Sequence, residues 1–212
     1  MTTTGPRVAR VALAAALAAA ALARVRADEG PELLDTVPDV VQSTDYSCGC
    51  AALEAVLAYW GIGLTEKEII EEAKVDPETG AEMEHLLEVA KKRGLKGVVR
   101  ERLVLRDLAK ELQKGRPVIA LIQAWRADES VAWKDDWDDG HYVVVIGIDR
   151  KNVYVEDPSL EDARGEIPHA EFIERWHCWT IDGRKTHGQA ILIGGREVAK
   201  RAKGPRKIER VK

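Results

Sequence analysis

From residue 48 onward, apolar residues recur every three or four positions, which is the spacing of one face of a helix. The first such segment ends at Trp60, and Gly61 follows where a helix C-cap is expected. Thr65 and Glu68 then have the spacing of a capping box, which opens a second helix. The pattern predicts helices over residues 48–60, 65–73, 81–93 and 104–114.

The pattern changes after Gly115, where continuous runs of apolar and β-branched residues replace the helical spacing. The polar turn over 149–152 separates two of these runs and predicts a hairpin. Because helices gather first and strands later, without alternating βαβ units, we expect an α+β architecture with an antiparallel sheet. The predicted strands cover 117–124, 141–148, 153–155 and 189–193, and a short helix covers 170–176.

The N-terminal segment has the order of charges and apolar residues that is typical of an export signal. Arg7 and Arg10 precede an apolar stretch over 11–23, and the first acid is Asp28. That stretch is shorter than the ~18 residues that a bilayer span needs. We therefore expect residues 1–27 to be a cleaved signal peptide, which leaves an exported protein in the periplasm or outside the cell. The alternatives are an Ala-rich helix of the fold and an uncleaved anchor.

Charge is distributed unevenly along the chain. The net charge is −4, but residues 1–27 carry +4 and residues 196–212 carry +6. The body over 28–195 has 20 Lys and Arg against 34 Asp and Glu, a net charge of −14, which argues against a core that binds nucleic acid. We expect 28–195 to be one monomeric domain with no stable membrane insertion after signal removal. Residues 196–212 are expected to be a solvent-exposed basic tail.

A nucleophile is expected at the start of the first predicted helix. Cys48 lies in its first turn, where the positive end of the helix dipole favours a thiolate. Gly49 beside it leaves room for the backbone of a substrate. Gln42, upstream, could donate to an oxyanion together with the Cys48 N–H. The alternative is that Cys48 is a small buried apolar side chain, the usual fate of a free cysteine.

A histidine and a carboxylate are expected to meet at one end of the predicted hairpin. His141 follows Gly140 at the mouth of a very apolar strand, where its ring stays near solvent and can exchange protons. Asp157 ends the partner strand, and in a tight hairpin the end of one strand lies beside the start of the other. This placement would let Asp157 orient the imidazole. Taken singly, His141 could also be a capping residue and Asp157 a turn residue before proline.

These segments resemble the bacteriocin-processing cysteine peptidase family, which belongs to the papain-like superfamily and cleaves leader peptides after a double glycine. The resemblance extends over residues 38–194. It implies a papain-like fold with the active site between a helical half and a β half. The residues that carry it are Gln42, the runs DYSCGCAAL over 45–53 and YWG over 59–61, GHYVVV over 140–145 and DPS over 157–159, with GRPVI over 115–119 and FIERWH over 172–177.

The resemblance also assigns roles to individual residues. It implies that Cys48 is the nucleophile of a cysteine peptidase, His141 its general base and acid, Asp157 the orienting residue and Gln42 the oxyanion donor. The substrate would be a peptide or protein, although we do not expect a double-glycine leader to be required of a stand-alone, exported relative. Cys50 stands where proline is usual in this family, and Cys178 where an acid is usual. In an exported chain they are expected to form a disulfide.

The segment 125–139 is an insertion rich in acids and tryptophan. Clustered carboxylates suit calcium, but EF-hand spacing is absent. We therefore favour an acidic lip beside His141, with Trp125, Trp137, Gly140 and Gly49 expected to contact substrate and a preference for extended peptides with basic residues. The histidines and cysteines lack paired zinc spacing, so no metal and no cofactor are assigned.

Two alternatives to a hydrolase share this site. One is a catalytically silent module that binds peptides in the same cleft without cleaving them. The other is a peptidyl or acyl transferase, which would hand the acyl group to an amine and not to water. Labelling by a Cys-directed electrophilic peptide distinguishes the silent module, whereas the products formed distinguish the transferase.

Overall fold

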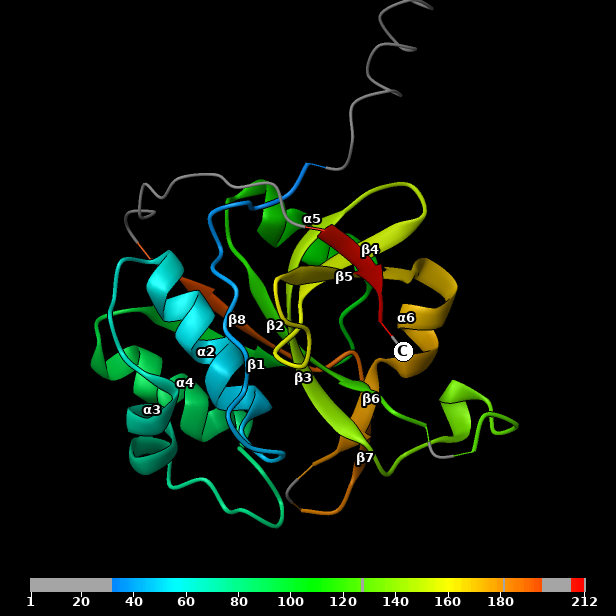
Figure 1. The fold of residues 1–212 in the computed structure, drawn as a ribbon, viewed down its shortest axis with the longest axis horizontal. Coiled ribbons are helices and arrows are strands. Elements are labelled where there is room, and N and C mark those ends of the chain that lie inside the picture. Colours follow the sequence, from blue (N-terminus) through cyan, green and yellow to red (C-terminus); the bar gives the residue numbers. More distant parts are fainter. Residues whose placement is uncertain (1–31, 127, 181, 196–206, 212) are drawn as a thin grey trace, which may run out of the picture. The chain divides into compact units, whose positions relative to one another are not determined.

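Helices come early in the chain and strands later, as the α+β prediction required (Figure 1). The computed structural model describes residues 32–126, 128–180, 182–195 and 207–211. The expected signal peptide, residues 1–27, lies outside these residues. The described residues from Leu33 onward belong to one structural unit. None of the helices in the described part is long and apolar enough to cross a bilayer.

The early helices lie where the apolar spacing predicted them. They are α2 (Cys48–Tyr59), α3 (Glu66–Ala73), α4 (Met83–Lys92) and α5 (Leu105–Gln113). The predicted capping box is present at α3, where the Thr65 hydroxyl accepts from the Glu68 N–H. In return, the Glu68 carboxylate accepts from the Thr65 N–H at 2.8 Å. Local side-chain chemistry therefore fixes where α3 begins.

The strands form one large sheet with seven described strands in the order β1-β8-β2-β3-β4-β5-β9, and a separate pair, β6-β7. Its strands are β1 (Lys96–Arg100), β2 (Val118–Gln123), β3 (Gly140–Ile148), β4 (Asn152–Glu156), β5 (Ala163–Pro168), β8 (Ala190–Gly194) and β9 (Lys207–Arg210); the pair is β6 (His177–Trp179) and β7 (Lys185–His187). The hairpin β3-β4 is the one predicted. Every pairing is antiparallel except β5-β9, which is parallel, so the sheet is mixed at that edge.

Both faces of the sheet are covered by helices, which explains its continuous apolar runs. In β3, Tyr142, Val144 and Ile146 pack into the core that α2, α3 and α4 cover. Val143 and Val145 point to the opposite face, where they pack with residues of α5 and of α6 (His169–Arg175). Figure 1 shows α2, α3 and α4 together on one side of the sheet and α6 on the other. Strand β3 is thus held rigidly by packing on both faces, and this packing also fixes the backbone position of His141 near its start.

The strands that the sequence analysis missed are short or polar. Strand β5 contains Arg164, which is only 4% exposed. Its guanidinium is paired with Glu156 at 2.8 Å and with Asp35 at 2.6 Å, so the buried charge is compensated. Strand β9 falls in the tail that we expected to be solvent-exposed. Ile208 and Arg210 are exposed as expected, but β9 pairs with the edge of β5 and Val211 is buried, so the prediction is wrong for Val211.

Candidate active site

Helix α2 presents Cys48 at its N-terminal end, and polar contacts fix the loop before it. Ser47, the N-cap residue, is buried, and its Oγ accepts from the Thr44 hydroxyl at 2.7 Å. The Ser43 N–H donates to the Glu66 carboxylate at 2.9 Å, which ties the loop to α3. Cys48 is 9% exposed and lines a groove. Its thiol therefore lies at the end of the helix where backbone N–H groups lack intrahelical partners.

The hairpin β3-β4 brings a histidine and an aspartate together. His141 is the second residue of β3, and Asp157 directly follows β4. The His141 Nε2 and the Asp157 Oδ1 are 2.6 Å apart, and both side chains are buried. The Ser159 N–H and hydroxyl donate to the same carboxylate oxygen at 2.9 Å and 2.8 Å. The placement of Asp157 beside His141 is as the hairpin geometry predicted.

Opposing influences act on the protonation of this pair. Burial is the largest influence on His141 and lowers its pKa, but the Asp157 carboxylate and the Cys48 sulfur both favour the imidazolium, outweigh burial and raise the pKa of His141 to about 9. Burial acts to raise the pKa of Asp157, but the His141 ring and the Ser159 donors outweigh it, and the pKa is lowered. The buried pair therefore favours an imidazolium held by a carboxylate.

The two ring nitrogens of His141 have different surroundings. Nε2 is taken by Asp157, while Nδ1 is buried and makes no aligned hydrogen bond to a described residue. Cys48 is the other side chain that, together with Asp157, raises the pKa of the ring. Nδ1 is therefore the nitrogen available to the thiol, and the carboxylate on the far side fixes the tautomer that presents it.

Trp125 covers His141 from outside. Its ring centroid lies 4.5 Å from that of His141, with the planes at 59°. The Trp125 backbone has φ 49°, in the left-handed region that non-glycine residues rarely adopt. We expected the His141 ring to remain near solvent, and this is wrong: the side chain is fully buried, because the indole closes over it. Trp125 is absent from the described lining of the groove and contacts His141, and its expected contact with substrate stays a prediction.

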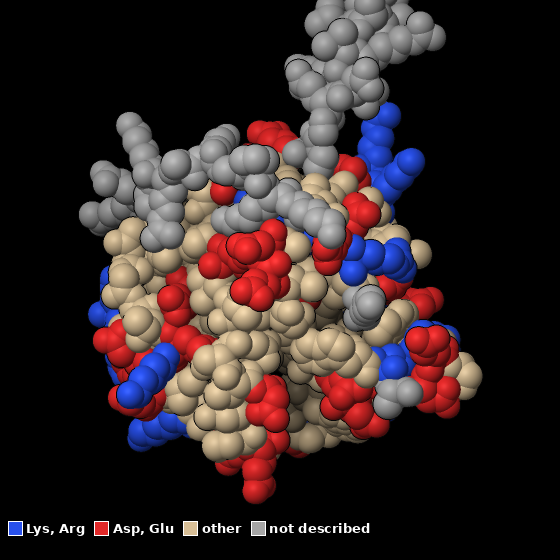
Figure 2. Space-filling model, in the orientation of Figure 1, with Lys and Arg blue, Asp and Glu red and all other residues tan. Residues whose placement is uncertain are grey.

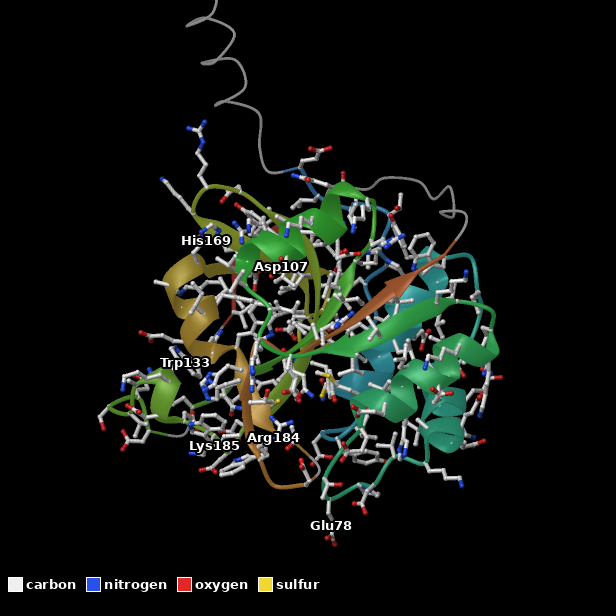
Figure 3. All side chains as sticks on the ribbon, turned by 180° about the vertical axis from the view of Figure 1, so that it is seen from behind. Glu78, Asp107, Trp133, His169, Arg184 and Lys185 are labelled. Carbon is white, nitrogen blue, oxygen red and sulfur yellow. The ribbon has the colours of Figure 1, made fainter. Side chains whose placement is uncertain are left out.

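The groove that contains Cys48 has a volume of about 670 Å³ and lies between the helical half and the β half. Figure 2 shows a hollow with Asp and Glu on both sides. Figure 3 shows Glu78 at the tip of the loop before α4, and Lys185 on β7 beside Arg184. Trp137 and Gly140, which were expected to contact substrate, both line it. The full lining is Asp45, Tyr46, Cys48, Pro77, Glu78, Thr79, Gly80, Ala81, Glu82, Leu121, Gln123, Trp137, Asp138, Gly140, Tyr142, Cys178, Trp179 and Thr180.

Gln42 lies next to the hairpin end that carries Asp157. Its backbone N–H donates to the Pro158 carbonyl at 2.9 Å, and its side-chain Nε2 donates to the Thr44 carbonyl at 2.7 Å. Its Oε1 is buried and makes no hydrogen bond to a described residue. One N–H of the amide is thus held by the loop before Cys48, and the second stays available as a donor.

Gly49 serves packing and does not open the groove to substrate, contrary to our expectation. A Cβ at this position would lie 3.0 Å from side-chain atoms of Leu86 and Tyr142 and 3.1 Å from Ala81. Gly49 is also absent from the described residues that line the groove. The missing side chain therefore lets α2 approach α4 and β3 closely, which carries Cys48 toward the strand that holds His141.

The disulfide predicted between Cys50 and Cys178 is wrong: all three cysteines lie in the described part of the chain, and all are free. Cys50 belongs to α2 and is fully buried in the core. The Cys178 thiol donates to the Gln189 Oε1 at 2.9 Å. Burial raises the pKa of each of these two thiols to about 12, so both stay protonated at neutral pH. Cys48 alone among the three has an imidazole as its partner.

The insertion 125–139 is anchored by residues that the sequence analysis did not single out. The Arg175 guanidinium lies 3.7 Å from the centre of the Trp133 ring, although Arg175 is fully buried. Gln123 accepts from the Asp139 N–H at 3.0 Å and donates to the His177 carbonyl at 3.0 Å, so it ties the base of the insertion to β6. Among the described residues, no three His, Cys, Asp or Glu side chains gather closely enough to hold a metal ion.

Comparison with known protein families assigns the chain to one of them. The sequence profile of the Peptidase C39 family matches residues 36–181, which include Cys48, His141 and Asp157. The chain belongs to the Peptidase C39 family. This C39 member has the papain-like cysteine peptidase fold that the resemblance implied, with the groove between its helical and β halves.

Relatives of this C39 member are known from sequence and from crystal structures. A protein of Methanothermobacter thermautotrophicus, described only as uncharacterized, is 35% identical over 123 residues, which span 57% of this chain and 71% of the relative. A Bacillus anthracis protein described as a C39-like peptidase superposes with a TM-score of 0.61 at 22% identity, covering 79% of this chain and 99% of that chain. The peptidase domain of Streptococcus ComA, a bifunctional ABC transporter involved in quorum sensing, superposes with a TM-score of 0.50 at 18% identity, covering 74% and 97%.

Proposed function

We propose that this protein is a cysteine peptidase that hydrolyses peptide bonds with Cys48 as nucleophile. The observation that carries the proposal is that Cys48 lines a groove of about 670 Å³ and lies close enough to His141 to raise the pKa of its ring, whose Nε2 is 2.6 Å from the Asp157 Oδ1. A nucleophile, a base and a group that orients the base are the three parts that acyl transfer needs. Membership of the Peptidase C39 family supports the same activity.

The reaction follows from the surroundings of these residues. His141 takes the proton of the Cys48 thiol through Nδ1, and the thiolate attacks the carbonyl carbon of the peptide. The negative charge that develops on the carbonyl oxygen is stabilised by the Cys48 N–H and by the free N–H of the Gln42 amide. The imidazolium then gives its proton to the leaving amine as the C–N bond breaks. Water attacks the resulting thioester, releases the carboxylic acid and restores the thiol.

Asp157 and Trp125 support this cycle without touching the reacting atoms. Asp157 holds the imidazolium that forms when the thiol is deprotonated, and it keeps the Nδ1 side of the ring toward Cys48. Trp125 covers the ring and excludes water from the 2.6 Å contact behind it. In a water-poor site this charged hydrogen bond is stronger than it would be in solvent.

The test is a peptide-library digest read by mass spectrometry, with the wild type compared with Cys48→Ala and Cys178→Ala. The second variant is the matched control, because Cys178 is a thiol in the same groove whose burial keeps it protonated. We expect cleavage by the wild type and by Cys178→Ala, and none by Cys48→Ala. Cleavage that survives Cys48→Ala would refute the proposal. Labelling of Cys48 by an electrophilic peptide without any cleavage would identify a silent peptide-binding module.

A further inference from the structure

The groove is lined by acidic side chains and by no basic ones among its described lining residues. Four carboxylates contribute to this lining. Asp45 and Glu82 belong to the helical half, and Asp138 comes from the insertion before β3. Figure 2 shows acidic side chains on both sides of the hollow, and Glu78, which lines the groove, lies on the loop before α4 in Figure 3. A ligand in this groove therefore meets negative charge from both halves of the fold.

None of these carboxylates forms an ion pair with a Lys or Arg of the described part of the chain, unlike acids elsewhere, although His85 acts against the raised pKa of Glu82. Glu72 pairs with Arg93 at 2.6 Å, and Glu101 pairs with Arg184 at 2.7 Å. No ion pair of this kind involves Glu82. Burial raises the pKa of Glu82, and the neighbouring Glu84 raises it further. An unpaired, partly buried carboxylate gains stability when a cation arrives, because the cation offsets both the burial and the repulsion.

The aromatic side chains of the β half add a second feature that favours cations. Trp137 and Trp179 both line the groove. The Lys185 ammonium lies 4.2 Å from the centre of the Trp137 ring and 4.8 Å from that of Trp179. The faces of these rings thus already bind an ammonium group of the chain itself. Lys185 is an exposed side chain, so it can move aside for another cation.

We propose that the groove selects peptide segments that carry Lys or Arg side chains next to the scissile bond, and that Glu82 and Asp138 bind these cations from opposite sides. This inference rests on the proposed function for the position of the scissile bond at Cys48. Two exposed ion pairs together amount to a preference of about tenfold over a neutral side chain. The preference weakens as salt screens the groove, since the carboxylates are reached by solvent.

The test measures binding separately from cleavage. Cys48→Ala is titrated with three fluorescein-labelled peptide pools that are identical except for fixed Lys, Gln or Glu positions, and fluorescence anisotropy gives the affinities. We expect the Lys pool to bind about tenfold more tightly than the Gln pool at low ionic strength, and the Glu pool to bind most weakly. Adding Glu82→Gln and Asp138→Asn should reduce the Lys preference to about twofold.

The matched control carries Glu71→Gln and Glu161→Gln in the same Cys48→Ala background. These two exposed acids lie outside the groove, so the control loses the same net charge without changing the lining. It should retain the full Lys preference. Equal binding of the Lys and Gln pools, absence of binding to all pools, or an equal loss of preference in the control would overturn the inference.

Cleavage of the same pools by the wild type separates the two proposals. If the wild type cleaves the Lys and Gln pools equally well, the proposed peptidase activity is supported and the proposed preference for cationic side chains is refuted. If the Lys pool binds preferentially to Cys48→Ala while the wild type cleaves nothing, the preference for cationic side chains is supported and the proposed peptidase activity is refuted.

Discussion

Asp157→Asn is the substitution that tests the candidate site most directly. Asparagine keeps the shape of the side chain and can still hydrogen-bond to the His141 ring, but it removes the negative charge 2.6 Å from Nε2. Each tenfold change in proton affinity is worth roughly 1.4 kcal/mol, so holding the His141 pKa at about 9 instead of 6.5 is worth about 3 kcal/mol. Burial opposes this shift, Asp157 is the larger of the two influences that raise the pKa, and Cys48 is the smaller.

Without the carboxylate, burial dominates and the pKa of His141 should fall at least to its ordinary value. An imidazolium that is less stable by up to about 3 kcal/mol should slow cleavage by roughly 100-fold. This is a smaller loss than that of His141→Ala, which removes the base itself. The direct assay is an NMR titration of 15N-labelled histidine, in which the His141→Ala spectrum assigns the resonance.

The matched control is Asp149→Asn, at the opposite end of the same hairpin. Asp149 accepts from the Tyr154 hydroxyl at 3.0 Å and does not contact His141. The control should leave the His141 titration unchanged. If the His141 pKa stays near 9 in Asp157→Asn, or if both variants shift it equally, the electrostatic account of the site is refuted.

Three further predictions concern stability and access. The pKa of His141 is raised on folding, so its contribution to the free energy of unfolding is complete below pH 6.5 and is lost as pH rises through about 9. In urea melts of the wild type, the free energy of unfolding should fall by up to about 3 kcal/mol over that range. An equal fall with pH in His141→Ala would contradict this. Trp125→Ala should speed the acylation of His141 by diethyl pyrocarbonate, which mass spectrometry follows, whereas His141 should remain protected in Trp125→Phe. Equal acylation rates in the two variants would show that the indole does not shield His141. Gly165→Ala should cost about 1–3 kcal/mol in denaturant melts, because its Cβ would collide with Val211; Gly63→Ala, with open space around it, should be neutral, and equal losses would refute the packing argument.

The parts of the fold that could be predicted from sequence are those that local chemistry determines. The Thr65 capping box fixes the start of α3 by bonds within one turn. The apolar runs of β3 and β4 flank a short polar turn, so the hairpin and the approach of Asp157 to His141 followed from the chain itself. Strand β5 gave no such signal, because Arg164 is buried there through Glu156 on the neighbouring strand and through Asp35, which is far away in sequence.

In the candidate site, too, the residues placed by local sequence were predictable, and those placed by distant parts of the chain were not. The position of Cys48 at a helix start follows from the spacing of apolar residues after it. The left-handed turn that lays Trp125 on His141 has no local signature, since it depends on where the insertion is anchored. Gly49 was assigned to substrate because its small size was visible, whereas the neighbours that require that size, Leu86 and Tyr142, come from other elements.

Cys48 and His141 lie on opposite layers of the molecule, one at the tip of α2 and the other at the start of β3. While the chain is being synthesised, the sulfur emerges long before the imidazole does, and it is then an ordinary thiol. The two meet only when the sheet docks onto the helices and buries their shared core. Completion of folding is therefore the event that brings the proposed nucleophile beside its proposed base.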